Sequence, residues 1–283
     1  MSDRSVLGRE DYEEPRCLLD MNKGLRAVPS RSIPMARVTE KLDEYLSRDD
    51  WAAAERHLNY WLADAENAGD RMAQLAIESE RMGLFRKRGR REDALAAVRA
   101  ALALSDEPDI ADTLTAATAF VNIATVYKTF ELPDEALKYF EKALPVYEAH
   151  LKRNDARLGG LYNNLALALT DLKHFGEARA YYEKALSVME KVENGELERA
   201  VSLLNLADLE AAEKGAEEAE ETIQDLLDKA RALLDTPSLP RNGYYAYVLK
   251  SCAPTFEYYG RFMDAQELEE AASAIYRRQR EKA

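Results

Sequence analysis

The chain has 283 residues, of which 47% are hydrophobic, and its formal net charge is −13 at pH 7. This acidic balance, with a pI near 4.9, argues against a nucleic-acid partner, because binding to a phosphate backbone depends on a basic face. No run of about 18 apolar residues occurs, so no membrane-spanning helix is predicted. The charged start is unlike a signal peptide, and two distant cysteines (Cys17 and Cys252) form no disulfide framework. Together these features favour a reducing, cytoplasmic location.

Residues 1–34 are predicted to form an irregular N-terminal segment that lies outside any repeat. They carry three prolines and five arginines and show no sustained periodicity. Two interpretations stay open for this segment. It is either a loosely packed leader or an arm that folds back on the rest of the chain through Tyr12, Leu18, Leu19 and Met21.

From residue 35 onward the chain repeats itself about every 42 residues. In the last four copies an alanine follows a small residue after 12 positions, whereas Leu42 and Met82 occupy that place in the first two, and the middle alanines stand at 54, 94, 136, 178, 219 and 265. A sustained period of this length indicates stacked copies of one structural unit, not a single globular core. The predicted repeats span approximately 35–69, 70–108, 109–153, 154–194, 195–238 and 239–281.

Each repeat is predicted to contain two helices. The first carries apolar residues at helical spacing, as Leu161, Leu165 and Leu169 do. After a turn, the second opens with acids followed by alanine, as in Asp134-Glu135-Ala136 and Glu217-Glu218-Ala219, and acids in a first turn suit the helix dipole. Alanines are expected where two helices pass closely. Pro145 falls inside a second helix and is expected to bend or end it.

This pattern resembles the tetratricopeptide repeat (TPR), whose usual unit is about 34 residues long. The longer unit here, with the strings NNLALAL and YYEKALSVME, resembles the extended repeats of the kinesin light chain type. The resemblance covers about residues 35–281. It implies an all-α, right-handed superhelical TPR solenoid of about six helix-turn-helix repeats in residues 35–283, with the first helices lining a concave groove.

The strongest candidate for a binding site is a series of asparagines. Asn122, Asn164 and Asn205 each stand two residues before the small residue of a central repeat, a position that the resemblance places in the groove. An asparagine side chain offers both a donor and an acceptor, so it can pair with the backbone of an extended peptide. Kinesin light chain-like repeats and bacterial peptide-sensing TPR regulators use groove asparagines in this way. The resemblance therefore implies this role for Asn122, Asn164 and Asn205. The alternative is that these asparagines bond a neighbouring repeat or cap a turn.

Other groove candidates have mixed chemistry, which suits a peptide with alternating side chains. They are Thr125, Lys128, Asn163, Leu167, Asp208, Tyr247 and Ser251. The carboxylate clamp of chaperone-binding TPRs is missing, since Val121, Thr125 and Val201 occupy positions that would need Lys, Arg or Asn. Recognition of a chaperone C-terminus is therefore disfavoured.

Two further clusters allow two interpretations each. The sixth repeat holds five tyrosines that either pack a terminal cap or bind a partner: Tyr244, Tyr245, Tyr247, Tyr258 and Tyr259. The turn of the second repeat holds five cations that are either solvated surface or attract an acidic partner or a nucleic acid: Arg86, Lys87, Arg88, Arg90 and Arg91.

The sequence shows no signature of an enzyme. The three histidines are isolated, and neither a phosphate-binding glycine loop nor a G-x-S-x-G motif occurs. We therefore expect no catalytic residue, no metal and no cofactor. The predicted function is a non-catalytic adaptor or scaffold that binds a protein or extended peptide segment, with no nucleic acid and no membrane as partner. The alternatives are a peptide-sensing signalling regulator without its own output domain, or a structural protein that forms homo-oligomers through its terminal repeats.

Overall fold

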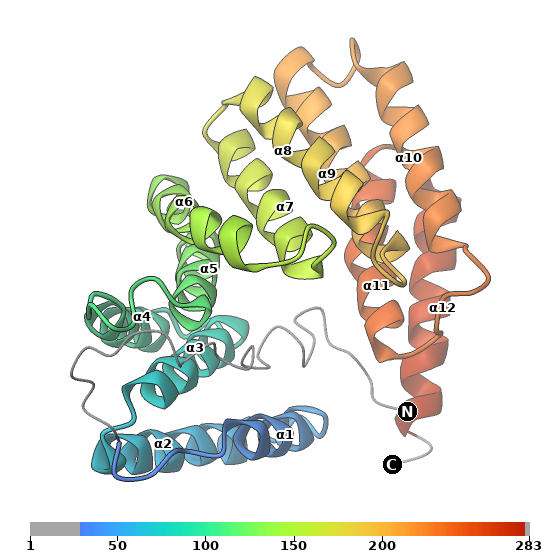
Figure 1. Cartoon of the computed structure of the whole chain (residues 1–283). Coiled ribbons are helices and arrows are strands. Elements are labelled where there is room, and N and C mark those ends of the chain that lie inside the picture. The colour runs from blue at the N-terminus through green and yellow to red at the C-terminus, as the bar shows by residue number, and fades with distance from the viewer. Residues whose placement is uncertain (1–28, 281–283) are drawn as a thin grey trace. The chain divides into compact units, whose positions relative to one another are not determined.

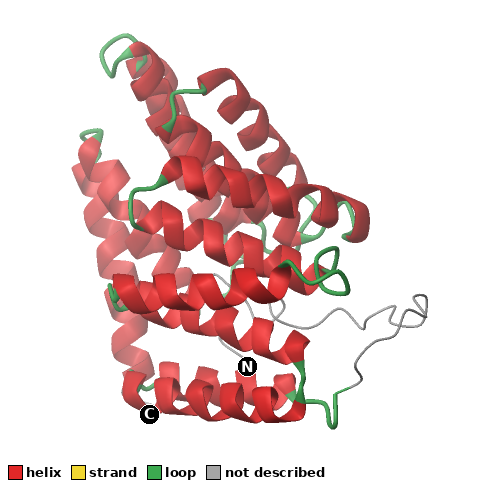
Figure 2. Ribbon diagram, turned by 90° about the vertical axis from the view of Figure 1, so that its left-hand side faces the viewer, coloured by secondary structure: helices red, strands yellow, loops and turns green. Residues whose placement is uncertain are grey.

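The computed structural model describes residues 29–280, and every regular element in this range is an α-helix (Figures 1 and 2). Twelve helices follow one another as six helix pairs, which confirms the predicted all-α fold of about six helix-turn-helix repeats. The chain divides into two compact units, whose described parts are residues 29–150 and 151–280. We call them the N-terminal unit and the C-terminal unit. The arm interpretation for Tyr12, Leu18, Leu19 and Met21 lies outside the described residues.

The N-terminal unit consists of three helix pairs. They are α1 (Met35–Leu46) with α2 (Trp51–Ala68), α3 (Arg71–Lys87) with α4 (Arg91–Ser105), and α5 (Leu114–Thr129) with α6 (Pro133–His150). The two helices of each pair pack against each other, and α3 also packs against α2 and α5. Local sequence starts these helices: Asp50, Asp70 and Thr113 are N-caps whose side chains accept a backbone N–H three residues ahead.

The C-terminal unit repeats this arrangement. Its pairs are α7 (Ala156–Asp171) with α8 (Phe175–Met189), α9 (Glu196–Lys214) with α10 (Glu220–Leu234), and α11 (Gly243–Tyr258) with α12 (Phe262–Arg280). The first helix α9 contacts the first helices α7 and α11 on either side of it. This contact places the first helices of three successive repeats next to one another, which matters for the site described below.

A left-handed residue ends the first helix in five of the six pairs, always five residues before the middle alanine. These residues are Asp49, Gly89, Glu131, Lys173 and Gly260, with φ between 56° and 80°. The next backbone N–H then bonds a carbonyl five residues back, as His174 N–H does to the Leu169 carbonyl at 2.8 Å. This is the Schellman arrangement that satisfies the free carbonyls of a helix end. Three of the five are not glycine, so composition alone does not reveal the motif.

One local expectation was wrong, and so was one of the two outcomes expected for Pro145, an end of its helix. The second helix α10 begins only at Glu220, so Glu217 and Glu218 precede it. The reason is that α9 extends to Lys214, seven residues after Ala207, whereas α3, α5, α7 and α11 end five residues after the corresponding position. Pro145 also does not end its helix, because α6 continues to His150. Proline has no N–H, so the Glu141 carbonyl four residues earlier has no helical partner. Both Glu141 and Pro145 are exposed, so water can donate a hydrogen bond to this carbonyl.

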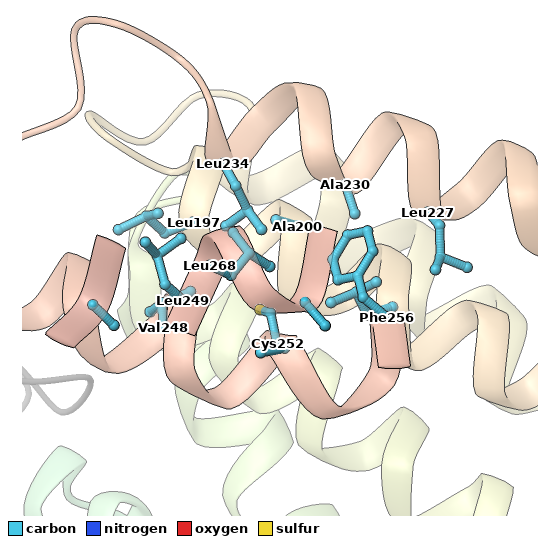
Figure 3. Close-up of a cluster of buried hydrophobic side chains, with 14 of the residues drawn as sticks. Leu197, Ala200, Leu227, Ala230, Leu234, Val248, Leu249, Cys252, Phe256 and Leu268 are labelled. Atoms are coloured by element: carbon cyan, nitrogen blue, oxygen red, sulfur yellow. The ribbon is translucent and has the colours of Figure 1, made fainter. Parts of the chain in front are cut away.

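Small residues fill the places where paired helices cross. The middle alanines of the first four repeats are completely buried, as are Ala101, Ala143 and Ala185 seven residues after three of them. In the C-terminal unit, Leu249, Cys252 and Phe256 of α11 pack among leucines of α9, α10 and α12 (Figure 3). Burial raises the pKa of the Cys252 thiol to about 12. This cysteine therefore acts as a small apolar core residue and is not ionised at neutral pH.

The EKAL strings noted in the sequence have a structural role in two repeats. The Lys142 ammonium group lies over the rings of Phe120 and Tyr139, at 5.4 and 5.3 Å from their centroids. Lys184 repeats this contact 42 residues later, over Tyr162 and Tyr181. Such cation–π contacts contribute about 0.5–1 kcal/mol each at partly exposed sites.

Candidate functional site

One side of each first helix in the C-terminal unit stays partly exposed. On α7 the partly exposed residues Gly160, Asn163, Asn164, Leu167 and Thr170 recur at three- and four-residue spacing and form one stripe. On α9 and α11 the same register gives the partly or fully exposed residues Val201, Asn205, Asp208, Tyr247, Ser251 and Pro254. We call these three stripes the first-helix face of the C-terminal unit, and the corresponding residues on the first helices of the N-terminal unit form the first-helix face of that unit. Every candidate residue of the C-terminal unit lies on its first-helix face.

The structure brings two of the candidate asparagines into direct contact. The Asn205 Nδ2 group donates a hydrogen bond to Asn163 Oδ1 at 3.1 Å, across two successive repeats. The buried Ser202 hydroxyl donates to the same oxygen at 3.1 Å. Part of the hydrogen-bonding capacity of Asn205 is therefore used between repeats, as the structural alternative expects. Asn164, one residue after Asn163 and partly exposed, lies outside this contact.

Two acids of α9 are paired with tyrosines of the last repeat. The Tyr259 hydroxyl donates to Asp208 Oδ1 at 2.8 Å, and the Tyr244 hydroxyl donates to Glu198. Burial raises the pKa of both carboxyl groups, and the tyrosine hydrogen bonds partly oppose this shift. Sequence reasoning missed Glu198, although it lies on the same stripe as Asn205, seven residues earlier. Of the five tyrosines of the sixth repeat, Tyr247 and Tyr258 are exposed to solvent, at 51% and 77%.

In the N-terminal unit the corresponding stripe of α5 is more enclosed. Thr118 hydrogen-bonds the Tyr147 hydroxyl at 2.9 Å, and the Thr125 hydroxyl donates to the Val121 carbonyl at 2.8 Å. The hydroxyl of Ser251 in the other unit is used in the same way, toward the Tyr247 carbonyl. The Thr125 and Ser251 hydroxyl groups keep lone pairs as acceptors, but their protons are committed within their own helices, whereas the Thr118–Tyr147 hydrogen bond joins α5 to α6. Lys128 is partly exposed near the end of α5.

Asn122 differs from the other candidates because it is buried and incompletely bonded. Its exposed fraction is 9%, and its Nδ2 group finds no hydrogen-bond acceptor among the residues that the structure describes. Leaving a buried amide donor without an acceptor costs about 1–3 kcal/mol. Native proteins satisfy the great majority of such groups, so an exception needs an explanation.

Glu80 occupies the same register position in the second repeat, two residues before Met82. Burial, aided by the nearby Asp43 carboxylate and opposed by Lys87, raises the pKa of Glu80 to about 8. At neutral pH this side chain is therefore mostly a neutral carboxyl group. A protonated carboxyl group has one O–H donor and a carbonyl acceptor, so it offers the same two functions as an asparagine amide.

Within residues 29–280, no three His, Cys, Asp or Glu side chains gather in a way that could hold a metal ion. No helix in the same range is both long and apolar enough to cross a membrane.

Comparison with known proteins identifies the family. The tetratricopeptide repeat model matches residues 74–149 and 157–232, which is more than half of the chain. The protein therefore belongs to the tetratricopeptide repeat family. No curated protein matches its sequence.

Solved structures confirm the resemblance to the kinesin light chain type at the level of the fold. BtubC (BKLC) from P. vanneervenii superimposes with a TM-score of 0.62 at 21% identity, covering 74% of this chain and 84% of that one. A putative kinesin light chain with nearly identical TPR-like repeats, from Podosopora anserina, gives 0.51 at 17% identity, covering 73% and 96%. The apo form of RapI gives 0.52 at 14% identity, covering 89% and 100%.

Proposed function

We propose that this protein is a non-catalytic adaptor or scaffold that binds extended segments of a partner protein on the first-helix face of each of its two units. Tetratricopeptide repeat proteins generally bind proteins or peptides, which supports this class of function. The observation that carries the proposal for this chain is the buried Asn122 Nδ2 group, which lacks an acceptor among the described residues. A backbone carbonyl of a bound peptide would supply that acceptor once the buried amide rotates toward the exposed side of α5 on binding.

The chemistry of the register position supports backbone recognition. Asn122, Asn164 and Asn205 each carry an amide, and neutral Glu80 offers an equivalent donor and acceptor. Such groups can pair with the N–H and C=O of any extended chain. The neighbouring candidates would then contact side chains of the segment bound to their own unit and set its preference: Thr125 and Lys128 in the N-terminal unit, and Leu167, Asp208, Tyr247 and Ser251 in the C-terminal unit.

The contacts of Asn122 and Asn205 lead to different expectations for their alanine variants. Replacing Asn122 by alanine removes an unsatisfied buried donor, so it should leave stability unchanged or improved. Replacing Asn205 by alanine removes its bond to Asn163 and should cost about 1 kcal/mol. A purely structural role for Asn122 would instead require a loss of stability in its alanine variant.

The proposal is tested by selecting binders for the full-length chain from a displayed library of short unstructured peptides. The affinity of a selected peptide is then measured for the wild type and for the triple variant Asn122→Ala, Asn164→Ala and Asn205→Ala. We expect binding to be lost while the circular-dichroism spectrum stays helical. Asn59→Ala, at an exposed position of the second helix α2, is the matched control and should bind normally. Equal affinity for the wild type and the triple variant would refute the proposal.

Self-association through the terminal repeat is the second candidate. Tyr258, Phe262 and Met263 lie at the α11–α12 turn and are 77%, 65% and 70% exposed. An exposed apolar cluster of this kind often marks a contact site. Sedimentation velocity over a range of concentrations distinguishes the two functions, because an adaptor stays a monomer and an assembling protein gains mass.

A further inference from the structure

The basic turn of the second repeat borders a small cavity in the N-terminal unit. The cavity has a volume of about 150 Å³ and lies between the start of α2, the end of α3 and the α3–α4 turn. It is lined by Trp51, Ala52, Glu55, Leu84, Phe85, Arg88 and Arg90. None of these residues belongs to the first-helix face, so the cavity is a separate feature.

Stacking on aromatic rings holds the arginines of this turn in place. The Arg88 guanidinium lies over the Trp51 ring at 5.5 Å from its centroid, and Arg90 lies over Phe85 at 4.6 Å. Arg91 stacks in the same way on Phe130 of the next repeat at 5.5 Å. Stacking uses the flat face of a guanidinium group and leaves its N–H edge available for a carboxylate.

The charges of the turn are only partly neutralised. Arg90 forms ion pairs with Glu55 at 2.6 Å and with Asp93 at 2.8 Å. Arg88 and Arg91 are exposed, and among the described residues neither has an acidic partner. In a chain of net charge −13, this turn therefore stands out as a fixed, positively charged spot beside an apolar cavity.

We propose that this cavity is a second binding site, which takes an acidic peptide segment that carries one aromatic or branched aliphatic side chain. A cavity of about 150 Å³ is large enough for one benzene ring. Trp51, Leu84 and Phe85 would surround the apolar side chain, and Arg88 and Arg91 would pair with carboxylates on either side of it. An acidic protein segment fits better than a nucleic acid, because the cavity is lined by the apolar side chains of Trp51, Leu84 and Phe85.

The direct test uses a labelled acidic peptide with one central phenylalanine, added to the full-length chain at low salt. Binding is followed by fluorescence anisotropy and by tryptophan emission in a Trp61→Phe background, where Trp51 is the remaining tryptophan. We expect Arg88→Gln to weaken binding on the order of tenfold. Ala52→Leu should block the cavity without unfolding the chain, because Ala52 is exposed on α2. Arg56→Gln, an exposed cation on the same helix, is the matched control and should bind as the wild type does.

Two further probes distinguish the contributions of charge and shape. The same peptide with alanine in place of phenylalanine, or with amides in place of its acids, should bind at least tenfold more weakly. The proposal is overturned if the alanine peptide binds equally well, if Ala52→Leu leaves the affinity unchanged, or if a single-stranded oligo(dT) of matched charge binds more tightly than the acidic peptide.

Discussion

The sharpest stability prediction concerns Gly195, the residue that precedes α9. Its backbone (φ −70°, ψ 0°) is a conformation that any residue adopts, so nothing in the local geometry demands glycine. Glycine is required because there is no room for a side chain. A Cβ atom at Gly195 would lie 2.1 Å from the Met189 carbonyl oxygen and 3.1 Å from the Val192 carbonyl oxygen. Both atoms belong to the backbone of the α8–α9 connection, so a side chain cannot fit without moving that connection.

We expect Gly195→Ala to destabilise the chain by about 1–2 kcal/mol. Overpacking of this kind costs typically 1–3 kcal/mol. Replacing glycine also makes the unfolded chain less flexible, which offsets about 0.4–1 kcal/mol of this loss of stability. The matched control is Gly160→Ala in α7, where a Cβ atom would have no neighbour within 4 Å. Alanine is favoured over glycine in a helix by about 1 kcal/mol, so this variant should be more stable than the wild type.

Urea unfolding of the full-length chain, followed by circular dichroism, measures both variants. The same substitution should shift the unfolding midpoint in opposite directions at the two positions, down for Gly195→Ala and up for Gly160→Ala. Gly159→Ala serves as an intermediate case, because its Cβ atom would meet the flexible end of the Met189 side chain at 2.6 Å. If Gly195→Ala proved as stable as the wild type, the described packing of the α8–α9 connection would be wrong.

Three further predictions test the turns, the buried acid and the lysine contacts. Lys173→Gly should raise the melting temperature or leave it unchanged, because Lys173 has φ 64°; a clear loss would contradict its left-handed conformation. Stability should fall as the pH rises from about 4.5 through 8, because burial raises the pKa of Glu80 and ionised Glu80 is disfavoured in the folded state. Denaturant titrations at several pH values should show a smaller fall for Glu80→Gln, and an identical fall would refute this cause. Lys184→Ala should cost about 1–2 kcal/mol by removing both cation–π contacts, with Tyr162 and with Tyr181, whereas exposed Lys191→Ala should be neutral in the same urea assay.

The repeat fold was predictable because its requirements are visible in single residues. Two helices approach closely only where a small side chain stands, and Ala54, Ala94, Ala136 and Ala178 mark those places at nearly constant spacing. The left-handed turn residues were not predictable in the same way. Glu131 and Lys173 adopt a conformation usually reserved for glycine, and the hydrogen bonds of the whole turn hold them there.

The candidate site was predictable in its positions and not in its contacts. Helical register is enough to place Asn164, Asn205 and Tyr247 on one side of their helices. The bond from Asn205 to Asn163 depends on how two repeats stack, and so does the contact of Tyr244 with Glu198. The burial of Asn122 depends on tertiary packing as well. The cavity beside Trp51 was missed because its lining comes from two repeats, and in the sequence only the basic turn was visible.

The most direct test of the account is the affinity of a library-selected peptide for Asn122→Asp. This substitution keeps the size and one oxygen of the side chain but replaces the unsatisfied Nδ2 donor by an acceptor. The account predicts at least a tenfold loss of affinity for Asn122→Asp and no change for the exposed control Asn59→Asp. Unchanged binding by Asn122→Asp would show that this amide does not hold the backbone of a partner, and it would contradict the proposed use of the first-helix face.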